Sequence, residues 1–143
     1  TVVLLDGSTV RSGLSRELDH SPVDRAEHLR RVAHMAKILN DQGIITLCSF
    51  VSPSEDIRKQ CAQIIGEDRF NLVHMDADIE HCQKNKPELY KKAKEGTLKY
   101  MPGVNDVFEK PEKEWIKIMP EQLDEGVEDV VQKLQEENIF PVE

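Results

Sequence analysis

Short apolar runs alternate along this chain with longer segments whose apolar residues recur at helical spacing. The runs at 2–5 and 44–51 are nearly continuous, which is typical of strands covered on both faces. Two further strands are expected at 70–75 and 115–119. This alternation predicts an α/β fold with a mostly parallel sheet flanked by helices.

Capping residues mark where the helices between these strands begin. Ser21 and Pro22 suit the N-cap and first position of a helix that Gly43 can end. Ser52 is expected to cap the next helix, with Glu55 completing a capping box. The other helices are expected at 9–18, 76–84 and 87–95, and around Val127, Val130, Val131 and Leu134.

Three of the expected strands end in polar groups. These ends are Asp6-Gly7, the segment 49–52 and Asp76. Ligands of parallel α/β sheets bind beyond the carboxyl ends of the strands, so this convergence indicates a binding site. The alternative is that each strand end only needs a turn.

The charge and the cysteines restrict the partners. A formal charge of −8 on 143 residues argues against nucleic acid, although a local arginine cluster can still bind a small anion. No apolar stretch reaches the ~18 residues of a membrane span, so no membrane partner is expected. The 3 cysteines show no CxxC spacing, so they are expected to be buried free thiols of a cytoplasmic protein. No metal site is expected, because His74, His81 and Cys82 fit no zinc pattern.

Four motifs in order resemble the adenylylsulfate kinase family. They are LLDGSTVRSGLSRELDHSPVDRAEHLRRVAHMAKIL, CSFVSPSEDIR, LYKKAKEG and PGVNDVFEKPE. The resemblance implies one adenylylsulfate-kinase-like domain over 1–143 with a P-loop kinase-like fold. It also implies a kinase that uses ATP and Mg²⁺ to phosphorylate the 3′-hydroxyl of adenosine 5′-phosphosulfate, giving PAPS in sulfate assimilation.

The resemblance also implies the site residues. Asp6 would orient or deprotonate the acceptor hydroxyl, and arginines would hold its anionic group, for which a guanidinium fork is suited. By the same resemblance, the catalytic residues are Asp6, Ser52 and Lys92. The substrate-binding residues are Ser8, Thr9, Arg11, His20, Arg25, His28, Val51, Lys91, Met101 and Pro102.

Several positions depart from the family pattern. Ser8 stands where the family has a second acid, and His28 where it has asparagine. His20 and Met101 fall at the positions of two phenylalanines that clamp the substrate adenine. Stacking on an aromatic ring contributes about 1–3 kcal/mol per base, so these changes bear on the acceptor.

The phosphate-binding motif G-x-x-x-x-G-K-[ST] does not occur in the 143 residues. In the family it follows the central first strand, so the chain is expected to be N-terminally incomplete. The alternatives are a non-catalytic nucleotide-sensing domain of an ATP sulfurylase, or a kinase with another nucleotide acceptor. Besides its nucleotide substrate, the resemblance is compatible with a homodimer or with fusion to an ATP sulfurylase.

Each site residue also has a structural interpretation. Arg11 and Arg25 could pair with nearby acids, and Asp6 or Ser52 could simply cap a helix. Lys91 and Lys92 could be exposed lysines, and Arg30 and Arg31 are expected to be solvated charges on a helix face.

Overall fold

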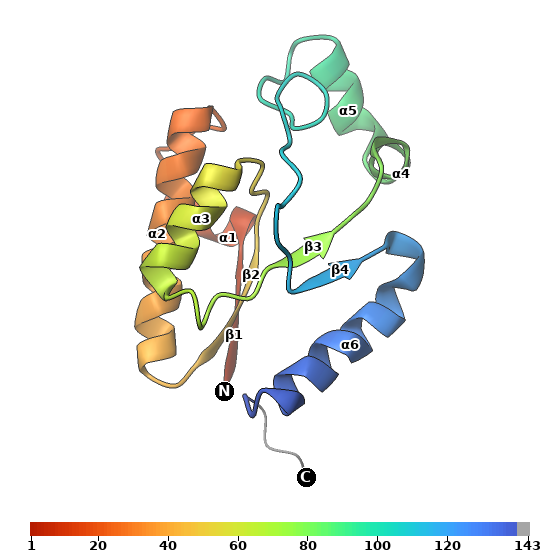
Figure 1. The fold of residues 1–143 in the computed structure, drawn as a ribbon. Coiled ribbons are helices and arrows are strands. Elements are labelled where there is room, and N and C mark those ends of the chain that lie inside the picture. Colours follow the sequence, from red (N-terminus) through yellow and green to blue (C-terminus); the bar gives the residue numbers. More distant parts are fainter. Residues whose placement is uncertain (140–143) are drawn as a thin grey trace. The chain divides into compact units, whose positions relative to one another are not determined.

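The computed structural model describes residues 1–139 and divides into two compact units (Figure 1). Unit 1 comprises Thr1–Phe70 and Glu88–Lys110, and unit 2 comprises the remaining described residues. Each unit contains one two-stranded parallel sheet with helices, which is the predicted α/β class.

Unit 1 is built on strands β1 (Val2–Asp6) and β2 (Ile45–Ser49). They pair in parallel with Asp6 opposite Ser49, so both strands end at the same edge. The polar residues that follow the two strands therefore lie next to each other at this edge of the sheet. The helices of this unit are α1 (Gly7–Ser12), α2 (Pro22–Asp41), α3 (Glu55–Ile65) and α5 (Pro87–Lys94).

Helix α2 begins as the sequence predicts. The Ser21 hydroxyl accepts from the Asp24 amide at 3.4 Å, and Pro22 occupies the first turn, where its missing N–H costs nothing. The helix packs against α3 and β2. Its buried apolar residues recur at helical spacing and form one stripe, namely Leu29, Val32, Ala33 and Ala36.

The predicted start of α3 is wrong by two residues. Ser54, not Ser52, is the N-cap, and its hydroxyl accepts from the Ile57 amide at 3.5 Å. The carbonyl of Ser52 instead accepts from Arg58 Nη1, which holds residue 52 outside the helix. Glu55 consequently lies in the first turn of α3 and completes no capping box with Ser52.

The prediction that β1 and β2 are covered on both faces is also wrong. Leu4 is 63% exposed and Leu47 is 48% exposed, so apolar side chains of both strands reach the surface of unit 1. Cys48 is exposed as well, and Cys61 and Cys82 are half-buried, although all three thiols are free as expected. A continuous apolar run shows that a strand can be covered, but not whether other residues cover it.

Unit 2 pairs β3 (Val73–Met75) with β4 (Ile116–Ile118) in parallel. Its helices are α4 (Ile79–Asn85), α6 (Leu123–Glu136) and the short 3₁₀ turn η1 (Pro120–Gln122). Gly126 lets α6 approach β4, because a Cβ atom there would lie 2.6 Å from Ile118 Cγ2. Of the helices described, none is both long and apolar enough to span a membrane.

Candidate functional site

Asp6 occupies the turn from β1 into α1 and caps that helix. One carboxylate oxygen accepts from the Thr9 amide at 3.0 Å and from the Ser8 hydroxyl at 2.7 Å. The other accepts from the Thr9 hydroxyl at 2.7 Å. These hydrogen bonds, that from the Ser8 side chain foremost, lower the pKa of Asp6 to about 2. Asp6 is therefore ionised at neutral pH, and Ser8 and Thr9 are its immediate partners.

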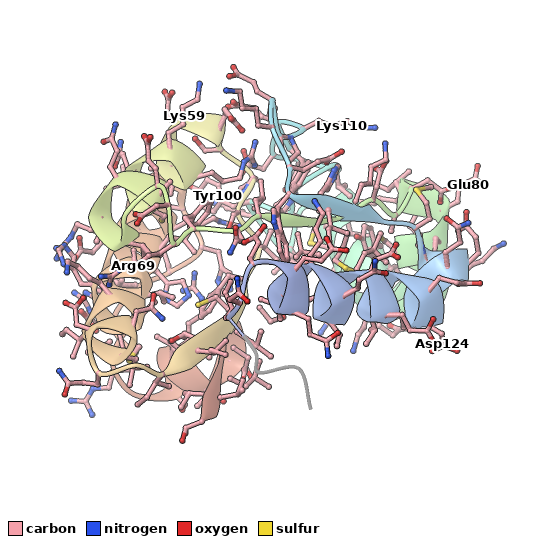
Figure 2. The ribbon with its side chains drawn as sticks, turned by 60° about the horizontal axis from the view of Figure 1, so that its bottom comes forward. Lys59, Arg69, Glu80, Tyr100, Lys110 and Asp124 are labelled. Carbon is pink, nitrogen blue, oxygen red and sulfur yellow. The ribbon has the colours of Figure 1, made fainter. Side chains whose placement is uncertain are left out.

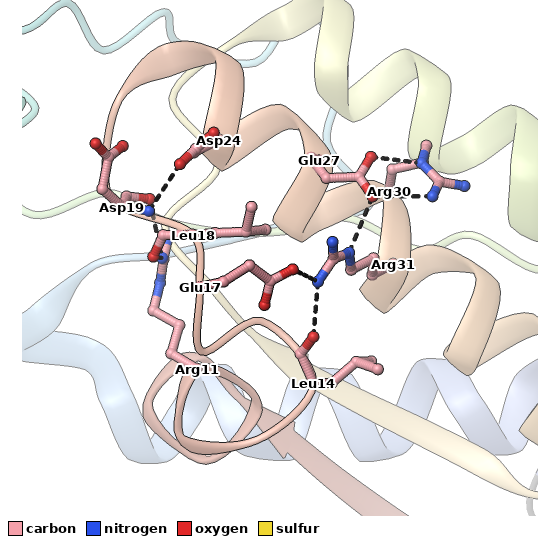
Figure 3. A network of polar contacts seen from close by, with 9 residues as sticks. All are labelled: Arg11, Leu14, Glu17, Leu18, Asp19, Asp24, Glu27, Arg30 and Arg31. Atoms are coloured by element: carbon pink, nitrogen blue, oxygen red, sulfur yellow. Dashed lines mark hydrogen bonds and ion pairs between the residues drawn. The ribbon is translucent and has the colours of Figure 1, made fainter.

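Arg11 and Arg25 donate to carbonyl oxygens of one short turn, residues 18–20. Arg11 Nη1 donates to the oxygens of Leu18 and Asp19 at 3.2 and 3.0 Å, as Figure 3 shows in part. Arg25 Nη2 donates to the oxygen of His20 at 3.2 Å. The turn therefore orients both guanidinium groups through its backbone carbonyls.

Side chains from both ends hold this turn in place (Figure 3). The Asp24 carboxylate accepts from the Asp19 amide at 2.8 Å. Arg31 donates to the Leu14 oxygen at 2.7 Å and pairs with Glu17 at 2.5 Å. Arg31 is thus an anchor rather than the predicted solvated charge, whereas Arg30 is exposed and pairs with Glu27.

Arg25 is buried, with only 7% of its surface exposed. Its Nη2 also donates to the Tyr100 oxygen at 2.9 Å, and its Nε has no partner among residues 1–139. Burial lowers the pKa of this guanidinium; Asp106 opposes that shift and Arg11 adds to it. Arg25 therefore carries a buried charge with a free donor, which is the arrangement expected of a group that awaits an anion.

His28 lies beside these arginines and is 2% exposed. Neither ring nitrogen has a partner within the described part of the chain, and the ring lies 5.4 Å from that of Phe50. Burial, followed by the charges of Arg11, His20 and Arg25, lowers its pKa to about 4. We call Arg11, His20, Arg25 and His28 the basic cluster.

The loop that carries Met101 and Pro102 reaches the basic cluster through its backbone. Tyr100, labelled in Figure 2, has a φ of 59° and turns its carbonyl to Arg25. Asn105 fixes the loop, since its amide donates to the oxygens of Ala93 and Leu98 and its oxygen accepts from the Met101 amide. Met101 and Pro102 are half-buried at this point of the loop.

Other candidate residues do not bind to the cluster directly. In residues 1–139, the side chains of Val51, Ser52, Lys91 and Lys92 make no hydrogen bond or ion pair with it. Both lysines are exposed on α5. Their site roles, and that of Ser52, remain predictions.

Three contributors were missed in the sequence. Phe50 follows β2, and its ring lies 5.4 Å from that of His28 and 3.8 Å from where a Cβ on Gly7 would be. Asp106 is the acid that acts on Arg25. Arg58 is buried and donates to the oxygens of Ser52 and Glu109 while pairing with Glu55. Of the three, only the pairing of Arg58 could have been expected from the sequence, because Glu55 and Arg58 are three residues apart on one helix.

No group of three or more His, Cys, Asp or Glu residues in the described chain is placed to hold a metal ion. The candidate site consists of the basic cluster, which lies near the ends of β1 and β2, and of Asp6, which caps α1.

The sequence profile of the adenylylsulphate kinase family matches residues 1–119. The chain belongs to the adenylylsulfate kinase family. An adenylyl-sulfate kinase of Bacteroides thetaiotaomicron is 42% identical over 110 residues, which are 76% of this chain and 55% of that protein. The bifunctional enzyme NodQ of Rhizobium tropici is 43% identical over 110 residues, 76% of this chain and 17% of NodQ.

A solved structure of this family gives the same fold. The Mycobacterium tuberculosis APS kinase CysC, in complex with AMPPNP and APS, superposes with a TM-score of 0.88 at 29% identity. The match covers 94% of this chain and 80% of CysC. The resemblance and the P-loop kinase-like fold are thereby confirmed, and family membership implies the use of a nucleotide. The chain spans about half the length, 55%, of the Bacteroides relative.

Proposed function

We propose that the protein containing this chain is an adenylylsulfate kinase that transfers the γ-phosphoryl group of ATP to the 3′-hydroxyl of adenosine 5′-phosphosulfate. One observation carries the proposal: the basic cluster buries nitrogen atoms that lack a partner among the described residues, namely Arg25 Nε and both ring nitrogens of His28. An anion with several oxygens would satisfy them, and the phosphosulfate group is such an anion. The relationship to a kinase solved with APS supports this acceptor.

The residues of this chain would act on the acceptor. Arg11 and Arg25 are already oriented by the carbonyls of residues 18–20, so binding requires little reorganisation of either side chain. Asp6, with a pKa of about 2, is a weak base and would accept a hydrogen bond from the acceptor hydroxyl rather than remove its proton. Of the two roles predicted for Asp6, we therefore propose that it orients the acceptor hydroxyl.

MgATP would supply the phosphoryl group and neutralise its charge during transfer. The phosphate-binding motif that holds ATP in P-loop kinases is not among the 143 residues, so the present site concerns the acceptor alone. Lys91 and Lys92 would close over the transferred group, as the family pattern implies. The free thiols fit the cytoplasmic location that belongs to this proposal.

Fusion to a second enzyme of sulfate activation is part of the same proposal. A bifunctional relative contains a region similar to this chain within a much longer protein, of which the match covers 17%. The partners proposed are therefore small nucleotides, together with an attached or associated ATP sulfurylase.

The test is product formation by the protein that contains these residues. Incubation with MgATP and adenosine 5′-phosphosulfate is expected to give PAPS and ADP in equal amounts, separated by ion-exchange chromatography. Binding of both nucleotides without turnover would favour the nucleotide-sensing domain instead. If the folded protein shows no binding and no turnover, both functions are contradicted.

A further inference from the structure

His28 is a buried imidazole without a hydrogen-bond partner. It is 2% exposed, and both Nδ1 and Nε2 lack a partner among residues 1–139. Phe50 covers it at 5.4 Å with the rings tilted by 59° and offers no acceptor. Buried polar groups are normally hydrogen-bonded, so an imidazole with two free nitrogens indicates a ligand that is absent.

After burial, the basic groups around His28 are what lowers its pKa. They come from Arg11 on α1, His20 on the following turn, and Arg25 and Arg31 on α2. Phe50, which follows the end of β2, adds an uncharged ring. Together with burial, these charges keep His28 neutral in the free protein, with a pKa of about 4.

An anion at the basic cluster would change this balance. A negative group within ~4–6 Å commonly raises the pKa of an imidazole by about 1–3 units. The protonated ring donates from both nitrogens, whereas the neutral ring donates from one only. An anion that contacts Arg11 and Arg25 therefore stabilises the imidazolium form of His28 in two ways. Its charge attracts the imidazolium, and its oxygens can accept a hydrogen bond from the second ring N–H.

We propose that binding of the anionic group of the acceptor at the basic cluster is coupled to the uptake of a proton by His28. This inference rests on the proposed function, because the acceptor is the anion concerned. His28 then makes the affinity for the acceptor depend on pH. The asparagine that the family resemblance places at this position has no titratable group, so the coupling would be a property of this chain.

The size of the effect follows from linkage. If the acceptor raises the pKa of His28 from about 4 to roughly 6, its Kd falls about fourfold between pH 7.5 and pH 5.5. The phosphosulfate group is fully ionised throughout this range, so the ligand does not contribute a proton of its own.

Calorimetry of adenosine 5′-phosphosulfate binding at pH 5.5, in buffers of different ionisation enthalpy, counts the protons taken up. The wild-type protein is expected to take up most of one proton, and His28→Asn is expected to bind without uptake. His34→Asn, on an exposed position of the same helix, is the matched control and retains the uptake. His20→Asn is also expected to retain the uptake, and loss of uptake in this variant alone would overturn the assignment of the proton to His28.

Equal uptake by wild type and His28→Asn, or binding with no uptake by wild type, would overturn the coupling but leave the proposed function intact. No binding heat at any pH from folded wild type would instead defeat the proposed function. A histidine NMR titration of the wild type, with and without the acceptor, needs no variant. The His28 resonances should shift their midpoint upward on binding, and an unchanged midpoint contradicts the coupling.

Discussion

Arg58 provides a quantitative prediction, because it is a buried cation with three different partners. It is 5% exposed and its guanidinium donates to the carbonyls of Ser52 and Glu109. It also pairs with Glu55 at 2.6 Å, and the Glu55 side chain is only 14% exposed. Arg58 thereby connects the start of α3 to residue 109 of the loop that follows the Arg25 contact.

The substitution Arg58→Met keeps an unbranched, largely apolar stem but removes the charge and the donors of the side chain. The Glu55 carboxylate would then be buried without this cation, and two carbonyls would lose their donor. Breaking a buried pair from one side costs about 3–5 kcal/mol. We therefore expect the free energy of unfolding to fall by this amount.

The chain contains a matched control with the same spacing. Glu27 and Arg30 also form an i,i+3 pair at 2.7 Å, but their side chains are 33% and 53% exposed. Arg30→Met is expected to cost less than about 1 kcal/mol, since water replaces the partner. Urea unfolding followed by circular dichroism compares the two variants. Similar costs for both, or less than about 1 kcal/mol for Arg58→Met, would refute the reasoning.

Three further predictions concern both units. Gly126→Ala would place a Cβ atom 2.6 Å from Ile118, and such overpacking costs about 1–3 kcal/mol of the stability of unit 2. The higher helix propensity of alanine offsets about 1 kcal/mol of this cost. Trp115 fluorescence during urea unfolding measures the net change. Because the pKa of His28 is about 4 when folded against an ordinary 6.5, the folded state binds fewer protons, so stability should be lost as pH falls from 6.5 to about 4. Urea midpoints at pH 5 and pH 7.5 should differ less in His28→Asn than in wild type. Asn105→Ala should make the loop more sensitive to limited proteolysis, because its amide no longer reaches the Leu98 oxygen; unchanged cleavage would contradict the anchor.

The parts of the fold that local chemistry determines could be predicted from the sequence. Ser21 and Pro22 specify the start of α2 through the first-turn amides, and the stripe around Leu29 is its buried face. The end of β1 at Asp6 followed from the change from apolar to polar residues. In each case, the interactions lie within a few positions along the chain.

Features that depend on distant residues could not be predicted. Ser52 and Ser54 are both suitable N-caps, and the choice depends on Arg58, which holds the Ser52 carbonyl. The exposure of Leu4 depends on what else packs on the strand, which the periodicity of the strand does not specify.

The arginines of the site show the same limit. The family resemblance proposes Arg11 and Arg25 as site residues, and the acids near them in sequence are the partners that it suggests. The structure instead pairs both with carbonyls of residues 18–20. The contact between Arg25 and the Tyr100 carbonyl spans 75 positions and requires an unusual φ of 59°. No local pattern indicates such a contact.

The central claim is that the buried guanidinium of Arg25 binds the anionic end of the acceptor. The most direct measurement is the Kd of adenosine 5′-phosphosulfate for Arg25→Met, set against Arg30→Met on the exposed face of the same helix. Removal of a buried charge from a polar contact costs about 2–5 kcal/mol, so Arg25→Met is expected to lose affinity by at least about thirtyfold, and Arg30→Met to bind as the wild type does. Equal affinity in both variants, with the fold intact, would contradict it.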